Sequence, residues 1–270
     1  MTHWDTEHAF ETINLQRRGG AARIQLNRPD TLNAWNRQFG VDLLAAIKLV
    51  AHDPEVRAVL IAGEGRGFSS GADLTAGFDP LPDGKPDVHT TLTERYHPIM
   101  TGLRAMPKPV VAAVQGPAVG IGCSLALCSD LILAGESAYF LLAFVNIGLV
   151  PDGGSSVFLP ARIGFTRAIE MAMLGERIPA AQALEWGLVN RVHADDELAA
   201  AADELIDRLA AGPTNSYAGT KRQLNRWVYS GMHDQLALEA EIQQEMARSE
   251  DFLEGVTAFV EKRPARFAGR

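Results

Sequence analysis

The sequence predicts an α/β fold, because short runs of strand character alternate with segments of helical pattern. The runs of strand character are ARIQL at 22–26, RAVLIAG at 57–63, PVVAAVQ at 109–115 and DLILAG at 130–135. Segments of helical pattern lie between or after them, at 36–52, 122–129 and 165–174. With 270 residues, the chain suits one large domain, or one domain with a smaller appendage.

Two of these strands open units of the same layout. In AVLIAGEGRGFSSGADL (58–74) and VVAAVQGPAVGIGCSLAL (110–127), a strand leads through a glycine-rich loop towards the start of a helix. Such loops expose backbone N–H groups, so two that converge would form a two-donor site for an oxyanion. Taken alone, each loop is better explained as a tight turn. GEGRG also lacks the glycine spacing of a dinucleotide fingerprint.

The segment between these units, FDPLPDGKPDVHTT (78–91), is rich in Pro, Gly and Asp. That composition predicts a long surface loop. Loops of this length often cover a functional site, although some are simply flexible.

After about residue 195 the pattern becomes helical throughout. The helical segments are DDELAAAADELIDRLAAG (195–212), TNSYAGTKRQLNRWVYSG (214–231) and HDQLALEAEIQQEMARSE (233–250), with Gly or Pro between them. This part has too little core of its own, so it must pack on the rest of the chain or on a neighbouring subunit. We therefore divide the chain into a core, 1–195, and a helical C-terminal region, 196–270.

The composition excludes several classes of protein. The formal charge of −8 argues against a broad basic surface for nucleic acid. Cys123 and Cys128 form no disulfide framework, the seven histidines are scattered without metal-ligand spacing, and buried reduced cysteines fit a cytoplasmic protein. The N-terminus has no signal-peptide pattern, and the apolar stretch 110–128 contains Pro and Gly, which favours a buried strand, turn and helix over a membrane span.

One carboxylate, Asp152, stands alone in a long uncharged run. No other charged residue occurs between Ser137 and Ala161, and the run around Asp152 reads VPDGGSS. Pro-Asp-Gly is a turn signal, and Asp is also a favoured N-cap for a helix such as 155–163. A carboxylate in an apolar environment is, alternatively, a candidate catalytic base, since burial raises its pKa.

Four motifs together resemble the crotonase superfamily, the enoyl-CoA hydratase/isomerase family. They are LNRPDTLNAWN (26–36), GEGRGFSSGADL (63–74), PKPVVAAVQGPAVGIGCSLALCSDLILA (107–134) and EGVTAFVEKRPARF (254–267). The resemblance implies a spiral of ββα units with a helical trimerisation region, acting on acyl-CoA thioesters as a homotrimer or a hexamer. It implies no separate cofactor and no metal, because CoA enters as part of the substrate.

The resemblance also implies site residues. The two oxyanion donors would be the N–H groups of Ser70 and Ile121. The remaining implied ligand contacts are Arg28, Thr31 and Leu32 in the first loop, Ala72, Asp73 and Leu74 in the second, Gly120 in the third, and Phe259 and Lys262 at the C-terminus, the last two at a neighbour's CoA site. From the residues alone, Asp73 is better explained as a structural loop residue. Two alternatives to a ligand contact stay open: Arg28 flanks the Pro29 turn without reaching a CoA phosphate, and Lys262 belongs to a solvated helix face.

The departures from the family pattern indicate the reaction. The hydratases of the family use two glutamates, and their places are taken here by Ser124 and Phe144. Asp152 instead matches a Pro-Asp/Glu-Gly-Gly turn of an isomerase branch, in which one carboxylate moves a proton from C2 to C4. We therefore expect an acyl-CoA double-bond isomerase. The alternatives are a hydratase or another crotonase reaction, and an acyl-CoA binder without catalysis.

Overall fold

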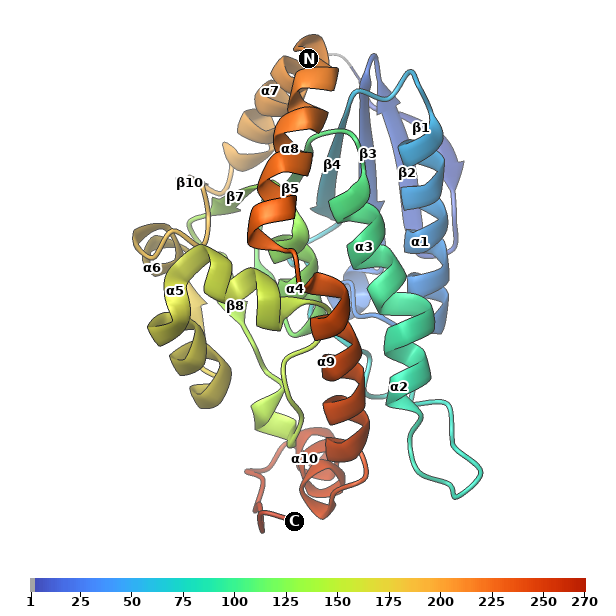
Figure 1. The fold of residues 1–270 in the computed structure, drawn as a ribbon, viewed down its shortest axis with the longest axis vertical. Coiled ribbons are helices and arrows are strands. Elements are labelled where there is room, and N and C mark those ends of the chain that lie inside the picture. The colour runs from blue at the N-terminus through green and yellow to red at the C-terminus, as the bar shows by residue number, and fades with distance from the viewer. Residues whose placement is uncertain (1–2) are drawn as a thin grey trace.

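Two sheets organise the N-terminal part of the molecule, and helices pack around them (Figure 1). The computed structural model describes residues 3–270. The larger sheet has the strand order β1-β2-β3-β4-β5-β7-β10, with antiparallel pairing only among β1, β2 and β3. In the smaller sheet, β8 lies between β6 and β9. The α/β prediction is confirmed.

The elements have the following bounds. The strands are β1 (Asp5–Ala9), β2 (Ile13–Arg18), β3 (Ala21–Leu26), β4 (Ala58–Gly63), β5 (Val110–Val114), β6 (Pro117–Val119), β7 (Leu131–Gly135), β8 (Tyr139–Leu141), β9 (Ile178–Pro179) and β10 (Arg191–His193). The α-helices are α1 (Arg37–His52), α2 (Val88–Thr91), α3 (His97–Ala105), α4 (Ile121–Cys128), α5 (Ser155–Leu174), α6 (Ala180–Glu185), α7 (Leu198–Ala211), α8 (Thr214–Val228), α9 (Met232–Met246) and α10 (Glu250–Glu261). Three short helical segments are η1 (Pro29–Thr31), the π-helical η2 (Leu92–Tyr96) and η3 (Val145–Ile147).

The chain alternates between the two sheets in a repeating order. β5 joins the larger sheet, β6 joins the smaller one, and α4 follows. The next turn repeats this order with β7, β8 and α5. The implied ββα units are therefore present, and all four predicted strands lie within one or two residues of their expected places.

One local prediction was wrong, and a second was correct except at its end. No helix starts after the first glycine-rich loop, because its backbone continues to pair with neighbouring segments: Ser69 N–H donates to Pro117 O and Asp73 N–H to Trp35 O. The predicted surface loop 78–91 ends at Asp87, because the Asp87 side chain accepts a hydrogen bond from Thr90 N–H and caps α2.

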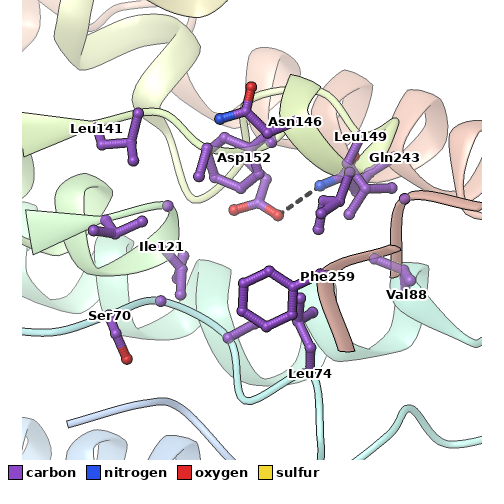
Figure 2. A pocket seen from close by; sticks show the side chains of 18 of the residues that line it. Ser70, Leu74, Val88, Ile121, Leu141, Asn146, Leu149, Asp152, Gln243 and Phe259 are labelled. Atoms are coloured by element: carbon purple, nitrogen blue, oxygen red, sulfur yellow. Dashed lines mark hydrogen bonds between the residues drawn. The ribbon is translucent and has the colours of Figure 1, made fainter. Parts of the chain in front are cut away.

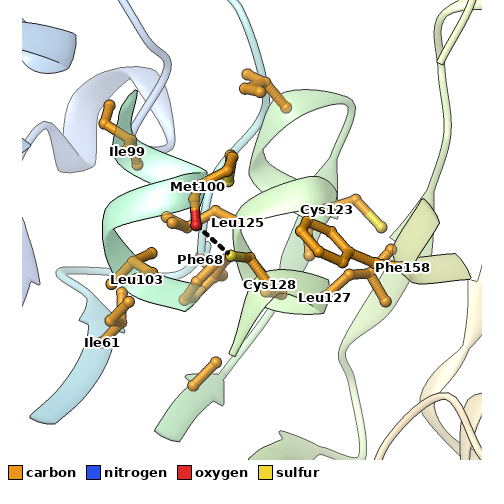
Figure 3. Packing of buried hydrophobic residues seen from close by; sticks show 14 of the residues in the cluster. Ile61, Phe68, Ile99, Met100, Leu103, Cys123, Leu125, Leu127, Cys128 and Phe158 are labelled. Atoms are coloured by element: carbon orange, nitrogen blue, oxygen red, sulfur yellow. Dashed lines mark hydrogen bonds between the residues drawn. The ribbon is translucent and has the colours of Figure 1, made fainter. Parts of the chain in front are cut away.

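The core surrounds α4, in which all eight residues are buried. Figure 3 shows its side chains packed with residues of α3 and α5, including Phe158 and Met100. Cys123 and Cys128 are buried and unpaired, as expected, and burial raises the pKa of both thiols to about 12. Dense packing holds α4 in place, and with it the helix N-terminus at Ile121.

The C-terminal region is helical, as its pattern predicted. In Figure 1, α8, α9 and α10 follow one another from one end of the molecule to the other. α7 packs on the larger sheet, α9 contacts α2 and α5, and α10 packs on η3. The contact of α10 with η3 is close: a Cβ atom at Gly255 would lie 2.6 Å from Ile147 Cα.

Substitution by alanine should change the free energy of unfolding in opposite directions at two helical glycines, Gly255 and Gly219. We expect Gly255→Ala to lower the free energy of unfolding by about 1–3 kcal/mol, because α10 must move off η3. Gly219 of α8 has open space around it, so Gly219→Ala should raise the free energy by about 0.5–1 kcal/mol through helix propensity. Urea denaturation of both variants measures the difference. Shifts of the same sign would contradict the described docking of α10.

Candidate active site

A pocket of about 440 Å³ lies between the two glycine-rich loops, the segment from β8 to α5, and the helices α9 and α10. Its walls are mostly apolar, and they include Leu74, Phe144, Leu149 and Phe259. Figure 2 shows the carboxylate of Asp152 directed into the space between Ile121 and Phe259. The pocket thus brings together five of the site residues implied above in addition to Asp152 and Ser70: Ala72, Leu74, Gly120, Ile121 and Phe259.

Asp152 is buried, and its carboxylate is not a helix cap. Its Oδ2 accepts a hydrogen bond of 2.8 Å from Gln243 Nε2, while Oδ1 has no partner among the described residues. The cap position of α5 is Gly154, which has no side chain to form a cap bond. The turn interpretation is confirmed for the backbone, and the N-cap interpretation was wrong. Oδ1 is therefore a buried acceptor without a hydrogen-bond partner among the described residues.

The backbone of the Asp152 turn is held by α4 and α5. Ser124 Oγ and Ser155 Oγ each donate to Asp152 O at 2.8 Å. Gly153 has φ +62°, and a Cβ atom there would lie 2.3 Å from Ile121 Cδ1. Only glycine fits this position, which explains the Asp-Gly-Gly sequence. Ser124, buried and bonded in this way, is not placed as a nucleophile.

The surroundings of Asp152 favour its protonated form. Burial raises its pKa to about 8, the negative charge of Glu239 contributes in the same direction, and the hydrogen bond from Gln243 opposes both. Glu239 is itself buried, which raises its pKa, although its carboxylate accepts hydrogen bonds from Gly154 N–H and from Ser156. Once ionised, Asp152 is therefore a stronger base than an ordinary carboxylate.

A raised pKa has a consequence for stability. Between about pH 4 and pH 8 the folded protein keeps the Asp152 proton that the unfolded chain has lost, so the free energy of unfolding falls as pH rises across this window. We expect Asp152→Asn to remove this slope and to stabilise the protein by about 2–5 kcal/mol at pH 9, with little change at pH 4. Urea denaturation at both pH values measures it. An Asp152→Asn variant less stable than wild type at pH 9 would contradict the described environment.

The two glycine-rich loops touch at the pocket, as the sequence suggested. A Cβ atom at Gly71 would lie 2.9 Å from Val119 O and 3.8 Å from Gly120 Cα. Ile121 follows as the first residue of α4, so its N–H has no partner within the helix. In the other loop, Ala72 N–H makes no hydrogen bond to any described residue.

The prediction for Ser70 was wrong in one respect. Ser70 N–H donates to Leu32 O at 2.8 Å, so it is not a free donor. Its hydroxyl donates to Thr31 O and points away from Asp152 (Figure 2). The free N–H of this loop belongs to Ala72, two residues later, because parallel pairing with Trp35 uses the groups on either side of it.

The first loop does not line the pocket in the described chain. Arg28 Nη1 donates to Ala34 O at 2.5 Å and pairs with Asp73 at 3.1 Å. Burial opposes ionisation of Asp73, but hydrogen bonds from Thr75 and Arg28 outweigh it and lower its pKa. These contacts hold Arg28 and Asp73 within the loops, and their implied contacts with CoA stay predictions. The carbonyl groups of Thr31 and Leu32 accept the hydrogen bonds from Ser70, and the predicted contacts of these two residues with CoA stay predictions.

The C-terminal motif is divided between the pocket and solvent. Phe259 lines the pocket of its own chain, whereas Lys262 is exposed at the end of α10, with φ +56°. Arg263 also lines the pocket, where its guanidinium binds the Glu254 carboxylate through bonds of 2.6 and 2.8 Å.

Gln243 and Glu239 were not predicted from the sequence. Both are buried on α9, one turn apart, and both face the Asp152 turn. α9 is rich in polar residues throughout, so sequence alone does not distinguish these two from exposed ones. Their spacing of four residues was the only available signal.

The described chain gathers no group of three or more His, Cys, Asp or Glu side chains that could bind a metal ion. Among the helices of residues 3–270, none has both the length and the apolarity needed to cross a bilayer.

Comparison with known proteins gives consistent matches over nearly the whole chain. A model of the family "Enoyl-CoA hydratase/isomerase" matches residues 16–270. The 1,2-epoxyphenylacetyl-CoA isomerase of Escherichia coli is 38% identical, covering 93% of this chain and 96% of that protein. A probable enoyl-CoA hydratase of Rhodobacter capsulatus is also 38% identical, covering 97% of this chain and 100% of that protein. A crystal structure of an enoyl-CoA hydratase from Mycobacterium avium subsp. paratuberculosis has a TM-score of 0.88 at 40% identity, covering 96% of this chain and 100% of that chain.

Proposed function

The chain belongs to the enoyl-CoA hydratase/isomerase family, and within it we propose that the protein is an acyl-CoA double-bond isomerase. The observation that carries this proposal is the composition of the pocket. Asp152 is the one carboxylate among the described residues that line it, and its Oδ1 is free. Both Δ3-Δ2-enoyl-CoA isomerisation and the related isomerisation of a phenylacetate-type thioester need a single acid/base group.

The proposed reaction begins with proton removal. Ionised Asp152 takes a proton from C2 of a 3-enoyl thioester, and the electron pair of that C–H bond passes into the thioester as an enolate. The N–H groups of Ala72 and Ile121 stabilise the enolate oxygen. Protonated Asp152 then returns the proton at C4, and the double bond ends between C2 and C3. The electrons balance within the substrate, with CoA as its carrier.

The residues at the two glutamate positions disfavour hydration. Addition of water needs a pair of groups that position and activate the water molecule. Ser124 uses its hydroxyl to hold Asp152 O, and Phe144 places an apolar ring in the pocket wall. Neither supplies a second base, which supports the isomerase over the hydratase.

The apolar pocket wall suits an uncharged acyl group. Phe78, Leu92 and Phe144 contribute to it, and the one guanidinium in the lining, Arg263, is neutralised by Glu254. The E. coli relative is named for an aromatic acyl group, phenylacetyl. We include both a linear and an aromatic acyl group in the proposed substrate class.

Assembly as a trimer or as a hexamer remains a prediction. Large apolar side chains are exposed on the single chain, including Phe165 of α5 and Trp227 of α8, with exposed fractions of 75% and 85%. Such exposure favours a subunit contact. Light scattering of the purified protein would measure the assembly.

The test is direct assay of both reactions. Purified protein is incubated with a 3-enoyl-CoA, and formation of the conjugated 2-enoyl-CoA is followed by absorbance; water addition to crotonyl-CoA is measured in parallel. We expect isomerisation to exceed hydration. Hydration as the faster reaction would establish the hydratase instead, and tight binding without turnover of any enoyl or epoxy thioester would establish a binding protein.

A further inference from the structure

Gln243 links α9 to the Asp152 turn through both ends of its carboxamide. The side chain is fully buried. Its Oε1 accepts from Val150 N–H at 3.0 Å. Its Nε2 donates to Asp152 Oδ2 at 2.8 Å, the bond drawn as a dashed line in Figure 2. Asp152 and Gln243 are 91 positions apart in the sequence.

The orientation of this carboxamide is fixed by its partners. A backbone N–H can only donate, so the oxygen of Gln243 must face Val150. The NH₂ group must then face Asp152, where it stabilises the ionised carboxylate. This bond occupies Oδ2 and leaves Oδ1 as the carboxylate oxygen without a hydrogen-bond partner among the described residues.

Building on the proposed isomerase, we propose that Gln243 is a positioning residue for the base: its NH₂ group holds Asp152 Oδ2, so that Oδ1 faces the α-carbon of the bound thioester. The hydroxyl groups of Ser124 and Ser155 bind the main-chain carbonyl of Asp152 and so fix the turn. They do not restrict rotation of the Asp152 carboxylate about its side-chain torsion angles. Among the described residues, only Gln243 hydrogen-bonds the carboxylate itself.

The charged groups around Asp152 make this bond important. Glu239, from α9, adds negative charge next to Asp152. Tyr96, from η2, is buried, and burial together with Asp152 raises its pKa, so it stays neutral. Arg263, beyond α10, is bound by Glu254 and Glu261. None of these three groups stabilises the ionised form of Asp152 by a hydrogen bond. Gln243 does, through its NH₂ group.

The test compares two variants that differ in which hydrogen bonds of the Gln243 side chain they remove. Gln243→Glu keeps the shape and the acceptor for Val150 N–H, but replaces the donor to Asp152 with a second carboxyl oxygen. Gln243→Met keeps the approximate length and removes both bonds. Gln244→Met is the matched control, since the hydrogen bonds of the neighbouring Gln244 side chain within residues 3–270 go to Pro86, Val88 and His89 and not to Asp152.

We expect kcat/KM for the isomerisation to rise with pH, and the midpoint of this rise to move up by about one to two pH units in both Gln243 variants. At pH 7 the loss should be about tenfold to a hundredfold, and it should shrink as pH increases. In the Gln244→Met control the midpoint should stay at its wild-type pH. A wild-type midpoint in Gln243→Met would overturn the proposal, because methionine cannot donate a hydrogen bond to Asp152 in any protonation state.

A second measurement is independent of turnover. The ¹³C carboxyl signal of Asp152, assigned with Asp152→Asn, is titrated in the free protein, and its midpoint should move up in Gln243→Glu and Gln243→Met. If wild type isomerises nothing while this midpoint still moves, the proposed function fails and the hydrogen-bond inference stands. If wild type isomerises and neither midpoint moves, the proposed function stands and the role of Gln243 is refuted.

Discussion

Asp152→Asn is expected to lower kcat for isomerisation of a 3-enoyl-CoA by about 10²–10⁴-fold, with little change in KM. The amide cannot accept the C2 proton, yet it has nearly the same size as the carboxyl group and can still accept the bond from Gln243. Steady-state kinetics at several pH values measure the effect. The wild-type kcat/KM should rise with pH through the ionisation of Asp152, whose pKa burial raises to about 8, and the variant should lose this rise.

The stability of the same variant provides the control. Asp152→Asn should be at least as stable as wild type at neutral pH, since it removes the cost of a buried charge. A loss of activity in a fully folded, more stable protein therefore identifies a missing base and excludes unfolding. Turnover that survives the substitution unchanged would remove Asp152 from the mechanism.

Ile121→Pro is expected to lower kcat/KM by about 10²–10³-fold, because it deletes one of the two proposed oxyanion donors. Proline is tolerated at the first position of a helix, where the N–H has no intrahelical partner. Gly120, with φ 52° and ψ −126°, lies outside the α region that a following proline disfavours. The substitution thus removes an N–H group at a place where the backbone accommodates the ring.

Ile121→Ala is the matched control for this second prediction. It removes the side chain that packs against Gly153 but keeps the N–H group. Kinetics of the two variants, with circular dichroism to verify folding, separate packing from hydrogen bonding. Equal losses in both would contradict a role for the Ile121 N–H.

The sequence was informative where local chemistry determines the outcome. Continuous Val, Leu and Ala runs predicted β4, β5 and β7, because strands buried on both faces have this composition. Asp152 was identified as unusual because a lone charge in an apolar run must be explained. The three-residue strands β6 and β8 were missed, since they are too short for a periodic pattern.

Long-range contacts account for what the sequence could not give. Gln243 and Glu239 face Asp152 only after α9 has packed on α5, and no local pattern encodes that contact. The free N–H group of this loop belongs to Ala72 and not to Ser70 because the loop pairs with Trp35, which lies far away in the sequence. The cap interpretation of Asp152 failed because the chain turns sharply at Gly153 and Gly154, whose φ angles are positive.

The span between Asp152 and Gln243 has a consequence for when the protein becomes active. A ribosome synthesises the base and both glycine-rich loops well before it reaches α9. A nascent chain that ends before residue 243 therefore carries the acid without the amide that orients it. Proteolysis or a premature stop codon that removes α9 and α10 should accordingly lower turnover at pH 7 at least as far as Gln243→Met does, even where the sheets have already folded.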